Sequence, residues 1–157
     1  MDIFRQKWHD EISNENKKLR TYQKFKKDFK KELYLDTIRD RNKCIILTNF
    51  RVSSHTLHIE TGRHTKPHPT PESERKCTQC RLDEIENECH FLIRCSHYEE
   101  SRNEMFQTAE KYCSSFPHMN SDEKFHFIME NTERPVIFSL ANFLYTSFKR
   151  RNCTAPT

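Results

Sequence analysis

Apolar residues recur at three- and four-residue intervals along most of the chain, which is the spacing of one face of an α-helix. Near the N-terminus, this pattern predicts a short helix whose apolar face is formed by Phe4, Trp8 and Ile12. A longer amphipathic helix is predicted next, because its apolar positions again step by three and four: Leu19, Tyr22, Phe25, Phe29 and Leu33.

The middle of the chain combines two further helices with a break. Residues 37–50 predict a helix with five apolar positions: Ile38, Ile45, Ile46, Leu47 and Phe50. In "RVSSHTLHIETGRH" we expect a short helix that a serine caps and that ends at Gly62, a residue suited to the left-handed position after a helix. Three prolines in "TKPHPTPESER" then favour an extended connector over residues 64–76.

Capping signals and one apolar run define the C-terminal part. Ser96 with Glu99, and Asn120 with Glu123, have the spacing of a capping box that opens a helix. Pro135 occupies the expected first turn of "PVIFSLANFLYTSFKRR", the most apolar segment, which we assign to the core. We therefore divide the chain into a basic helical segment, a connector and a second helical segment, packed as one domain: residues 1–63, 64–76 and 77–151.

Four of the seven cysteines and one histidine lie within "CTQCRLDEIENECHFLIRC". The spacing is C-x2-C-x9-H-x4-C, in which one pair of ligands on a turn and a second pair at a helix can surround an ion. Two alternatives stay open, since Cys89 or His97 can replace a ligand, or the cysteines can be ordinary buried thiols. We predict one structural zinc ion with all four tetrahedral positions filled by Cys77, Cys80, His90 and Cys95.

The second pair of ligands poses a geometric problem. His90 and Cys95 are five residues apart, about 140° around a continuous α-helix, which is too far for one ion. The capping signal at Ser96 indicates that the first helix ends near Arg94. We therefore expect Cys95 to lie on a bend, where its side chain can turn back toward the ion.

Composition narrows the fold class and the compartment. The 157 residues are 34% hydrophobic and include a single glycine, which disfavours glycine-rich phosphate loops and many-stranded barrels. We expect a mostly α fold, a small helical domain with a zinc-stapled unit made of a cysteine knuckle and a helix. No apolar run reaches the roughly 18 residues of a membrane helix. The charged start has no apolar signal core, so we expect an intracellular protein, in cytoplasm or nucleus, with reduced thiols.

Basic residues are concentrated in one part of the chain. Residues 17–31 hold eight Lys and Arg side chains and one acid, a net charge of +7, although the whole chain is +4. Such a concentration is typical of phosphate binding and predicts RNA or DNA as a partner, whereas the other interpretation is a solvated helix face. Five of the basic residues step by three and four opposite the apolar face: Lys17, Arg20, Lys24, Lys27 and Lys31.

Signals for catalysis are few. His55, His58 and Glu60 would suit a hydrolytic metal site, although we favour capping, packing or backbone-contact roles for them. The chain has no Ser-His-Asp signature, no Walker loop and no dinucleotide-binding fingerprint. We expect no enzyme activity, with a metal-dependent nuclease built on these three residues as the third hypothesis.

Several of these motifs occur together in one known family. "KLRTYQKFKKDFKKELYL", "LTNFRVSSHTLHIETGR" and "CTQC…ENECHFLIRCSHYEESRNEMF" resemble the zinc-binding region that follows the reverse transcriptase domain in non-LTR (LINE-type) retrotransposon polyproteins. The similarity runs from Leu19 to Phe106. Most of it is carried by the Cys-Cys-His-Cys string and by a second pattern: Arg51, Ser54, His55, Leu57, Gly62 and Arg63.

The resemblance implies a zinc-stabilised module that helps a reverse transcriptase core to hold element RNA or target DNA. It places the four predicted ligands at the family's ligand positions and adds Arg51 and Arg63 as candidate contacts to the nucleic-acid backbone. The chain has no [YF]-x-D-D polymerase motif and no recognisable endonuclease acids, so the module would not catalyse alone. The alternative is a zinc-stabilised protein-interaction module that binds no nucleic acid.

Overall fold

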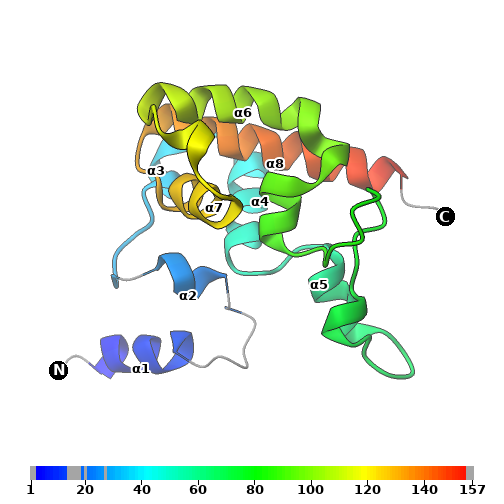
Figure 1. The fold of residues 1–157 in the computed structure, drawn as a ribbon. Coiled ribbons are helices and arrows are strands. Elements are labelled where there is room, and N and C mark those ends of the chain that lie inside the picture. The colour runs from blue at the N-terminus through cyan, green and yellow to red at the C-terminus, as the bar shows by residue number, and fades with distance from the viewer. Residues whose placement is uncertain (1–2, 14–18, 20, 27, 155–157) are drawn as a thin grey trace.

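The structure is a computed structural model that describes residues 3–13, 19, 21–26 and 28–154. The described part is mostly helical and holds no strand, only an isolated antiparallel bridge between Lys76 and Ile85. The prediction of a mostly α fold is therefore confirmed. In chain order (Figure 1), the helices, with single 3-10 or π turns labelled η, are α1 (Ile3–Ile12), α2 (Tyr22–Phe25), α3 (Tyr34–Thr37), α4 (Arg41–Arg51), α5 (His58–Thr61), η1 (Gly62–His64), η2 (Glu72–Glu74), η3 (His90–Arg94), η4 (Ser96–Tyr98), α6 (Glu99–Tyr112), η5 (Phe116–His118), α7 (Ser121–Glu130) and α8 (Arg134–Thr154).

The long helix α8 is the centre of the molecule. It packs against α4 and α6, and Figure 1 shows α6 and α8 running side by side. Aromatic rings fill the space between these helices and η3: the ring of Phe91 lies 4.7 Å from Tyr98, 4.7 Å from Phe148 and 6.1 Å from Phe50. Because Phe50 precedes the proline-rich connector and the other three rings follow it, a single hydrophobic core joins the two helical segments.

Two of the predicted helix starts are present. The side chain of Asn120 accepts a hydrogen bond from the Glu123 N–H (2.9 Å), and the Glu123 carboxylate accepts one from the Asn120 N–H (2.8 Å), which completes a capping box on α7. Pro135 lies in the first turn of α8. The capping box predicted at Ser96 is wrong, because Ser96 lies in the 3-10 turn η4 and α6 begins at Glu99 without a side-chain cap.

The helix predicted over residues 37–50 is present but starts later than expected. The single turn α3 ends at Thr37, and α4 starts at Arg41. Asp40 lies between them and accepts hydrogen bonds from the backbone N–H groups of Asn42 (2.9 Å) and Lys43 (3.2 Å). A carboxylate in this position satisfies N–H groups that have no partner in the first turn, so it starts a new helix.

The long basic helix predicted over residues 17–33 is wrong for the part of it that the structure describes. Helix α2 is a single turn, and Lys26 after it is already extended. Phe25 packs edge-on against Phe125 of α7, with ring centroids 5.5 Å apart, whereas Phe29 is 47% exposed. The tertiary contact of Phe25 therefore outweighs the helical period of the segment. Of the five basic residues predicted to share one face of this helix, three lie outside the described residues: Lys17, Arg20 and Lys27.

Gly62 does not have the left-handed conformation that we expected. Its φ is −61°, in the right-handed helical region, and the chain continues from it into η1. A Cβ atom at this position would lie only 2.7 Å from Cγ of Arg75. Arg75 in turn donates hydrogen bonds to the carbonyls of Ile59 (3.0 Å) and Thr70 (2.8 Å). Glycine is therefore needed here for close packing of the Arg75 side chain and not for its backbone freedom.

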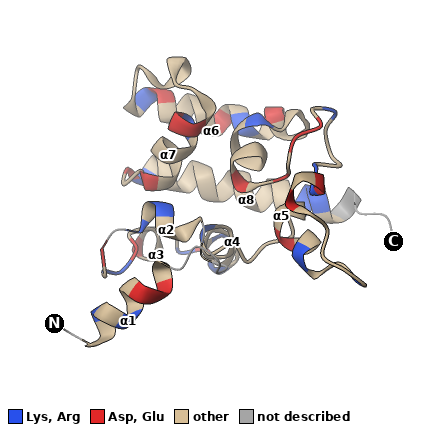
Figure 2. Ribbon diagram, turned by 60° about the horizontal axis from the view of Figure 1, so that its bottom comes forward, with Lys and Arg blue, Asp and Glu red and all other residues tan. Residues whose placement is uncertain are grey.

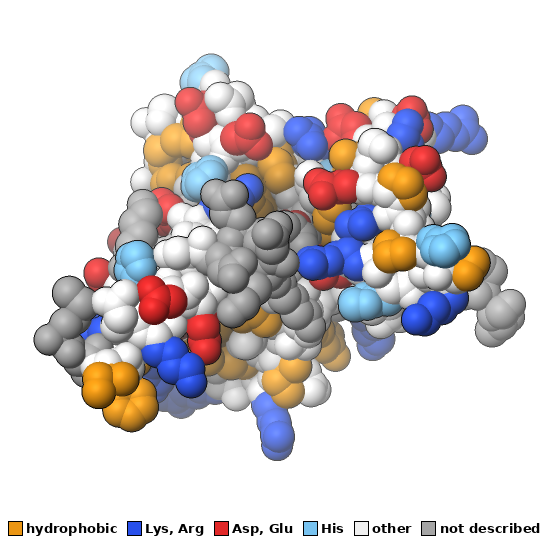
Figure 3. All heavy atoms as spheres, turned by 90° about the horizontal axis from the view of Figure 1, so that it is seen from below, with side chains coloured by type: hydrophobic (Ala, Val, Ile, Leu, Met, Phe, Trp, Pro, Cys, Tyr) orange, Lys and Arg blue, Asp and Glu red, His pale blue; other side chains and the backbone are white. Residues whose placement is uncertain are grey.

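Helix α1 is present as predicted, but only part of its apolar face is covered. Ile12 is buried, and Trp8 packs edge-on against Phe29 with ring centroids 5.5 Å apart. Ile3 and Phe4 are 82% and 75% exposed, and hydrophobic side chains are visible at the lower left of Figure 3. None of the helices in the described part of the chain combines the length and the apolar character that a membrane crossing requires.

Candidate metal centre

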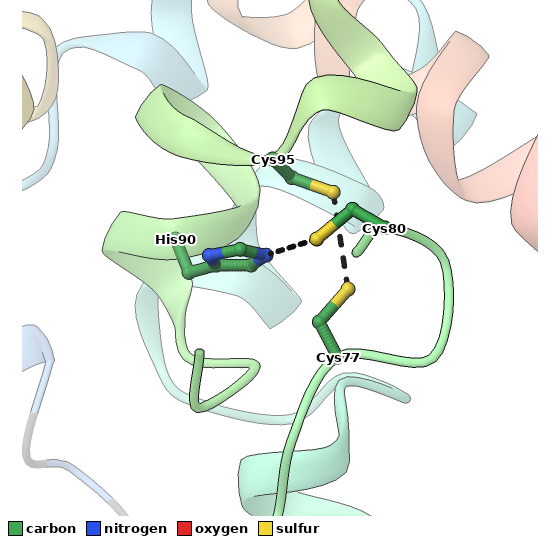
Figure 4. Close-up of side chains that lie close together, drawn as sticks. All are labelled: Cys77, Cys80, His90 and Cys95. Carbon is green, nitrogen blue, oxygen red and sulfur yellow. Dashed lines mark hydrogen bonds between the residues drawn. The ribbon is translucent and has the colours of Figure 1, made fainter. Parts of the chain in front are cut away.

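The four predicted ligands come together in the structure (Figure 4). One ligand atom from each of the four lies within 4.8 Å of all the others. Cys77 and Cys80 come from the loop after the connector, and His90 and Cys95 stand at the start and just beyond the end of η3. His90 and Cys95 are fully buried, Cys77 is 7% exposed and Cys80 is partly exposed.

A π turn solves the spacing problem between His90 and Cys95. Residues His90–Arg94 form η3, a π-helical segment, and the Cys95 N–H donates to the carbonyl of His90 at 2.7 Å. A bond between residues five apart widens the turn, so that positions five apart lie on nearly the same side. The predicted bend at Cys95 is present, with ψ of 116°, but the widened turn before it was not predicted.

Arg102 of α6 holds the end of this π turn in place. Its guanidinium donates hydrogen bonds to the carbonyls of Leu92 (2.8 Å), Phe91 (3.3 Å) and Cys95 (2.7 Å). The π turn ends here, and the last carbonyls of a helix need partners from outside it; the carbonyl of Cys95 also accepts the Tyr98 N–H at 3.3 Å. Arg102 is only 5% exposed, and its buried guanidinium is stabilised by the three carbonyls that it contacts. The side chain thereby fixes the backbone that carries the fourth ligand.

Distances within the cluster are those of a tetrahedral metal site. With Zn–S about 2.3 Å and Zn–N about 2.0 Å, a tetrahedron places two sulfurs about 3.8 Å apart, and a sulfur and a nitrogen about 3.5 Å apart. The Sγ atoms of Cys77 and Cys95 are 3.8 Å apart, and Sγ of Cys80 lies 3.4 Å from Nε2 of His90. The sulfurs are too far apart for a disulfide bond of about 2.0 Å. The four residues can therefore hold a metal ion.

Glu84 orients the histidine for this role. Nδ1 of His90 lies 2.8 Å from Oε2 of Glu84, and the guanidinium of Arg94 pairs with the same oxygen at 2.8 Å. A carboxylate beside Nδ1 favours the tautomer with hydrogen on Nδ1, which leaves the lone pair of Nε2 directed at the sulfurs. The backbone N–H of His90 also donates to the side chain of Asn87 at 2.8 Å, so both ring and backbone are positioned.

The pKa values of the cluster reflect the crowding of its thiols. The hydrogen bond with Cys95, together with burial, raises the pKa of Cys77 to about 12, and the same bond lowers the pKa of Cys95. Burial lowers the pKa of His90, but its hydrogen bonds with Cys77 and Glu84 outweigh this effect and raise the pKa overall. Deprotonating three neighbouring thiols requires positive charge between them, which a divalent cation supplies.

The two alternative ligands lie outside the cluster. Sγ of Cys89 contacts the carbonyl of Ser121 (3.8 Å) and the carboxylate of Asp122 (3.6 Å), so it faces α7. Burial raises the pKa of the Cys89 thiol to about 11. The ring of His97 packs edge-on against Tyr98, with centroids 4.8 Å apart. Neither residue belongs to the group of four whose ligand atoms converge.

A second carboxylate, Glu86, joins the loop that carries Cys77 to two segments distant in the sequence. It is 1% exposed and accepts hydrogen bonds from the Arg151 guanidinium (Nη2 to Oε2, 2.9 Å) and the His58 backbone N–H (2.7 Å). Sγ of Cys77 lies 3.6 Å from the same carboxylate. This role of Glu86 was not predicted. The signal was the alternation of glutamates in "DEIENE", which places every second side chain on one side of an extended segment.

The third of these glutamates, Glu88, fixes the turn after α4. Its Oε1 accepts a hydrogen bond from the Ser53 hydroxyl (3.0 Å) and lies 2.9 Å from Nε2 of His55. Ser53 is buried and has φ of 53°, a left-handed conformation that costs free energy in a residue other than glycine. The buried hydrogen bond offsets that cost, so Glu88 shapes the backbone between the two halves of the chain.

His55, His58 and Glu60 do not converge on a common point. The glutamate just described holds His55, and Nδ1 of His58 lies 2.9 Å from the carbonyl of Lys76. The carboxylate of Glu60 pairs with Arg63 at 3.7 Å. Within the described part of the chain, these three residues form no group able to hold a metal ion. These contacts agree with the packing and backbone-contact roles that we favoured for the two histidines.

Arg51 was expected to contact nucleic acid, and this expectation is wrong because the residue is 6% exposed. Its guanidinium donates to the carbonyl of Met129 (2.7 Å) and to the carboxylate of Glu32 (3.3 Å). It also lies over the ring of Tyr34, 5.5 Å from the centroid. Arg51 therefore holds α4, α7 and the segment before α3 together from within the core.

The other described candidates for nucleic-acid contact lie at the surface. Lys24 is exposed on α2, and Lys31 is exposed and forms an ion pair with Asp36. Arg63 is half-buried in its pair with Glu60. Figure 2 shows basic residues on α2, on α4 and at the C-terminal end of α8. In Figure 3, basic and acidic side chains are interspersed among the coloured atoms of the face seen from below. Of the five residues of the predicted stripe, the described part of the chain holds only Lys24, on α2, and Lys31, before α3.

Four protein ligands around one point leave no place for a water molecule, which suits a structural metal and not a hydrolytic one. Fold and site thus define the class: a small helical protein with a buried Cys3His cluster able to hold a metal ion. Comparison of the chain with protein-family models, with curated proteins and with solved structures finds no match.

Proposed function

We propose that the protein is a zinc-stabilised nucleic-acid-binding module that does not catalyse a reaction by itself. The observation that carries the zinc is the spacing of the four ligand atoms, with a sulfur pair at 3.8 Å and a sulfur–nitrogen pair at 3.4 Å. Three thiolates and one imidazole in a tetrahedron are a usual ligand set for structural zinc. The carboxylate of Glu84 behind His90 completes the arrangement typical of such sites.

Charge supports nucleic acid as the partner. Residues 17–31 carry a net charge of +7 in a chain of net +4, so the rest of the chain is net negative. Lys24 and Lys31 are exposed, and the side chain of Lys30 is 79% accessible. Basic side chains that release counterions from phosphates supply most of the affinity in binding that does not depend on sequence. The buried Arg51 is no longer part of the proposed surface.

The resemblance to the segment that follows a retrotransposon reverse transcriptase supports a biological setting for this activity. In that setting, the module would bind element RNA or target DNA beside a reverse transcriptase core, which would perform the chemistry. The dispersed positions of His55, His58 and Glu60 give no support to a nuclease.

A second candidate function is a zinc-stabilised protein-interaction module. The observation that favours it is the apolar end of α1, where Ile3 and Phe4 are 82% and 75% exposed. Burial of such side chains by a partner lowers the free energy, because apolar surface is removed from water. In this alternative, the lysines near α2 only keep the surface solvated.

Metal analysis and a binding titration on the purified chain test the proposal. We expect about one zinc ion per chain and binding of single-stranded RNA or DNA that weakens steeply as salt increases. Zinc without nucleic-acid binding at low salt would favour the interaction module. A chain that takes up no zinc would contradict the proposal at its centre.

A further inference from the structure

A cavity of about 350 Å³ lies between α4, the turn that follows it and the last turns of α8. Its wall combines aromatic rings with carboxamides: Tyr145 and Phe148 come from α8, Asn49 comes from α4 and Asn152 from the end of α8. None of the described residues that line it is acidic. A cavity of this size is large enough for one planar ring system with part of its sugar.

Positive charge stands at the edge of the same cavity. Lys149 belongs to its lining and is exposed. Nζ of Lys43 lies 6.0 Å from the centroid of the Tyr145 ring, on the α4 side. The cavity beside α2 differs in this respect, because its lining includes Glu72 and Asp122, whose charge disfavours a phosphate. Both cavities are lined by an aromatic ring and a lysine, but of the two only the first has no carboxylate among its described lining residues.

One buried side chain in the wall has an unused hydrogen-bonding atom. The side chain of His55 is 2% exposed, its Nε2 is engaged by Glu88, and its Nδ1 has no hydrogen-bond partner. The ring is packed between Phe50 and Phe148, with centroids 5.6 Å and 6.3 Å away. A buried polar atom without a partner is uncommon in folded proteins and requires an explanation, for which a bound water or ligand is one candidate.

We propose that this cavity binds one unstacked base of a single-stranded nucleic acid, with the adjoining phosphate near Lys43 and Lys149. Proteins that bind single strands place bases on aromatic rings and direct the backbone along basic side chains. Carboxamides such as those of Asn49 and Asn152 both donate and accept hydrogen bonds, as the edges of bases do. This inference rests on the proposed nucleic-acid binding and adds that the nucleic acid is bound as a single strand.

Fluorescence anisotropy with labelled oligonucleotides tests the site. Tyr145→Leu removes the aromatic face while keeping an apolar side chain, and loss of one stacked base corresponds to about 5- to 150-fold weaker single-strand binding. Tyr112→Leu, at an exposed tyrosine of α6 outside the cavity, is the matched control and should bind as the unmodified chain does. Asn152→Ala, at an exposed position, and its control Asn103→Ala on α6 repeat the comparison without touching the core.

A photo-cross-link locates the base directly. An oligonucleotide containing 5-iodouridine should attach to a peptide that includes Tyr145 or Phe148, as mass spectrometry of the digest will show. Comparing the affinities of RNA and DNA strands of the same sequence shows whether binding requires the ribose 2′-hydroxyl. Duplex of the same sequence should lose less affinity in Tyr145→Leu, because its bases stay stacked.

The outcomes separate this inference from the proposed function. If the chain binds single strands but Tyr145→Leu and Asn152→Ala bind equally well and cross-links fall elsewhere, the cavity is not the site and the proposed function stands. If the unmodified, zinc-loaded chain binds no oligonucleotide at low salt, both are overturned.

Discussion

The guanidinium of Arg151 lies against the carboxylate of Glu86, although the two residues are 65 positions apart in the chain. One pair of atoms, Nη2 and Oε2, is 2.9 Å apart, and Nη1 reaches the other oxygen. The same carboxylate accepts the His58 N–H and lies 3.6 Å from Sγ of Cys77. The C-terminal end of α8 is therefore tied to the loop that carries Cys77, the first residue of the Cys3His cluster.

Replacing Arg151 with methionine should destabilise the protein by about 3 to 5 kcal/mol, because the Glu86 carboxylate would stay buried without its partner. Urea unfolding of the zinc-loaded chain measures this change. Arg150→Met, at the exposed neighbouring position, should cost much less. Adding Glu86→Gln to Arg151→Met should recover part of the loss, since the uncompensated charge is removed. Equal losses in the two arginine variants would contradict the coupling.

Removing one thiol ligand should remove the metal and with it much of the stability of the segment that carries η3. Cys77→Ser should lower bound zinc from about one per chain to near zero and lower the melting temperature, as should a strong chelator, because metal binding contributes directly to folding. Cys113→Ser changes a cysteine outside the cluster and should leave both quantities unchanged. An unchanged melting transition in metal-free protein would argue against a structural metal.

Substitutions of the neighbouring residues His90 and Cys89 should have opposite effects on metal binding. His90→Ala should abolish tight metal binding, whereas Cys89→Ala should preserve it, because Sγ of Cys89 faces Ser121 and Asp122. The thiolate charge-transfer bands of the cobalt-substituted protein report the number of sulfur ligands. We expect the intensity of three sulfurs in the unmodified chain and in Cys89→Ala. A spectrum of four sulfurs would assign the site to Cys89 instead.

Glu84→Gln should weaken metal binding by about 10- to 100-fold, because the carboxylate that orients His90 and raises its basicity is lost. Competition with a chelator of known affinity measures the change. The four ligands stay in place, so the cobalt spectrum should keep its sulfur bands. Glu104→Gln, at an exposed position of α6, is the matched control and should bind metal normally. Equal metal affinities of the two variants would show that Glu84 does not influence the metal site.

The basic positions near α2 should control the salt dependence of nucleic-acid binding. Changing Lys24 and Lys31 together to Gln should lower the slope of log K against log salt by about 1.4 for a single strand, at about 0.7 per phosphate contact. All sequences should weaken alike, because phosphate contacts carry no sequence information. Lys66→Gln with Lys111→Gln makes the same change in net charge at other exposed positions. If both double variants have the same slope, general charge and not this surface governs binding.

Local signals in the sequence were enough to predict the helical class and the ligand set. The three- and four-residue period of apolar positions persists wherever a helix buries one face, and the capping box at Asn120 acts within a single turn. The spacing of Cys77, Cys80, His90 and Cys95 is equally local, and the structure brings these four together. These features depend on residues close in sequence, so their physical cause is visible there.

The tertiary structure decided the features that depend on distant partners. The predicted basic helix is broken where Phe25 packs against Phe125. Arg51 lies in the core, where it donates a hydrogen bond to the carbonyl of Met129. Arg102 stabilises the π turn that brings Cys95 to His90. The free energies of these long-range contacts are as large as the local preferences that they oppose, because burial desolvates every group involved. The sequence by itself therefore determined which residues can bind the metal, whereas packing determined which charges reach the surface.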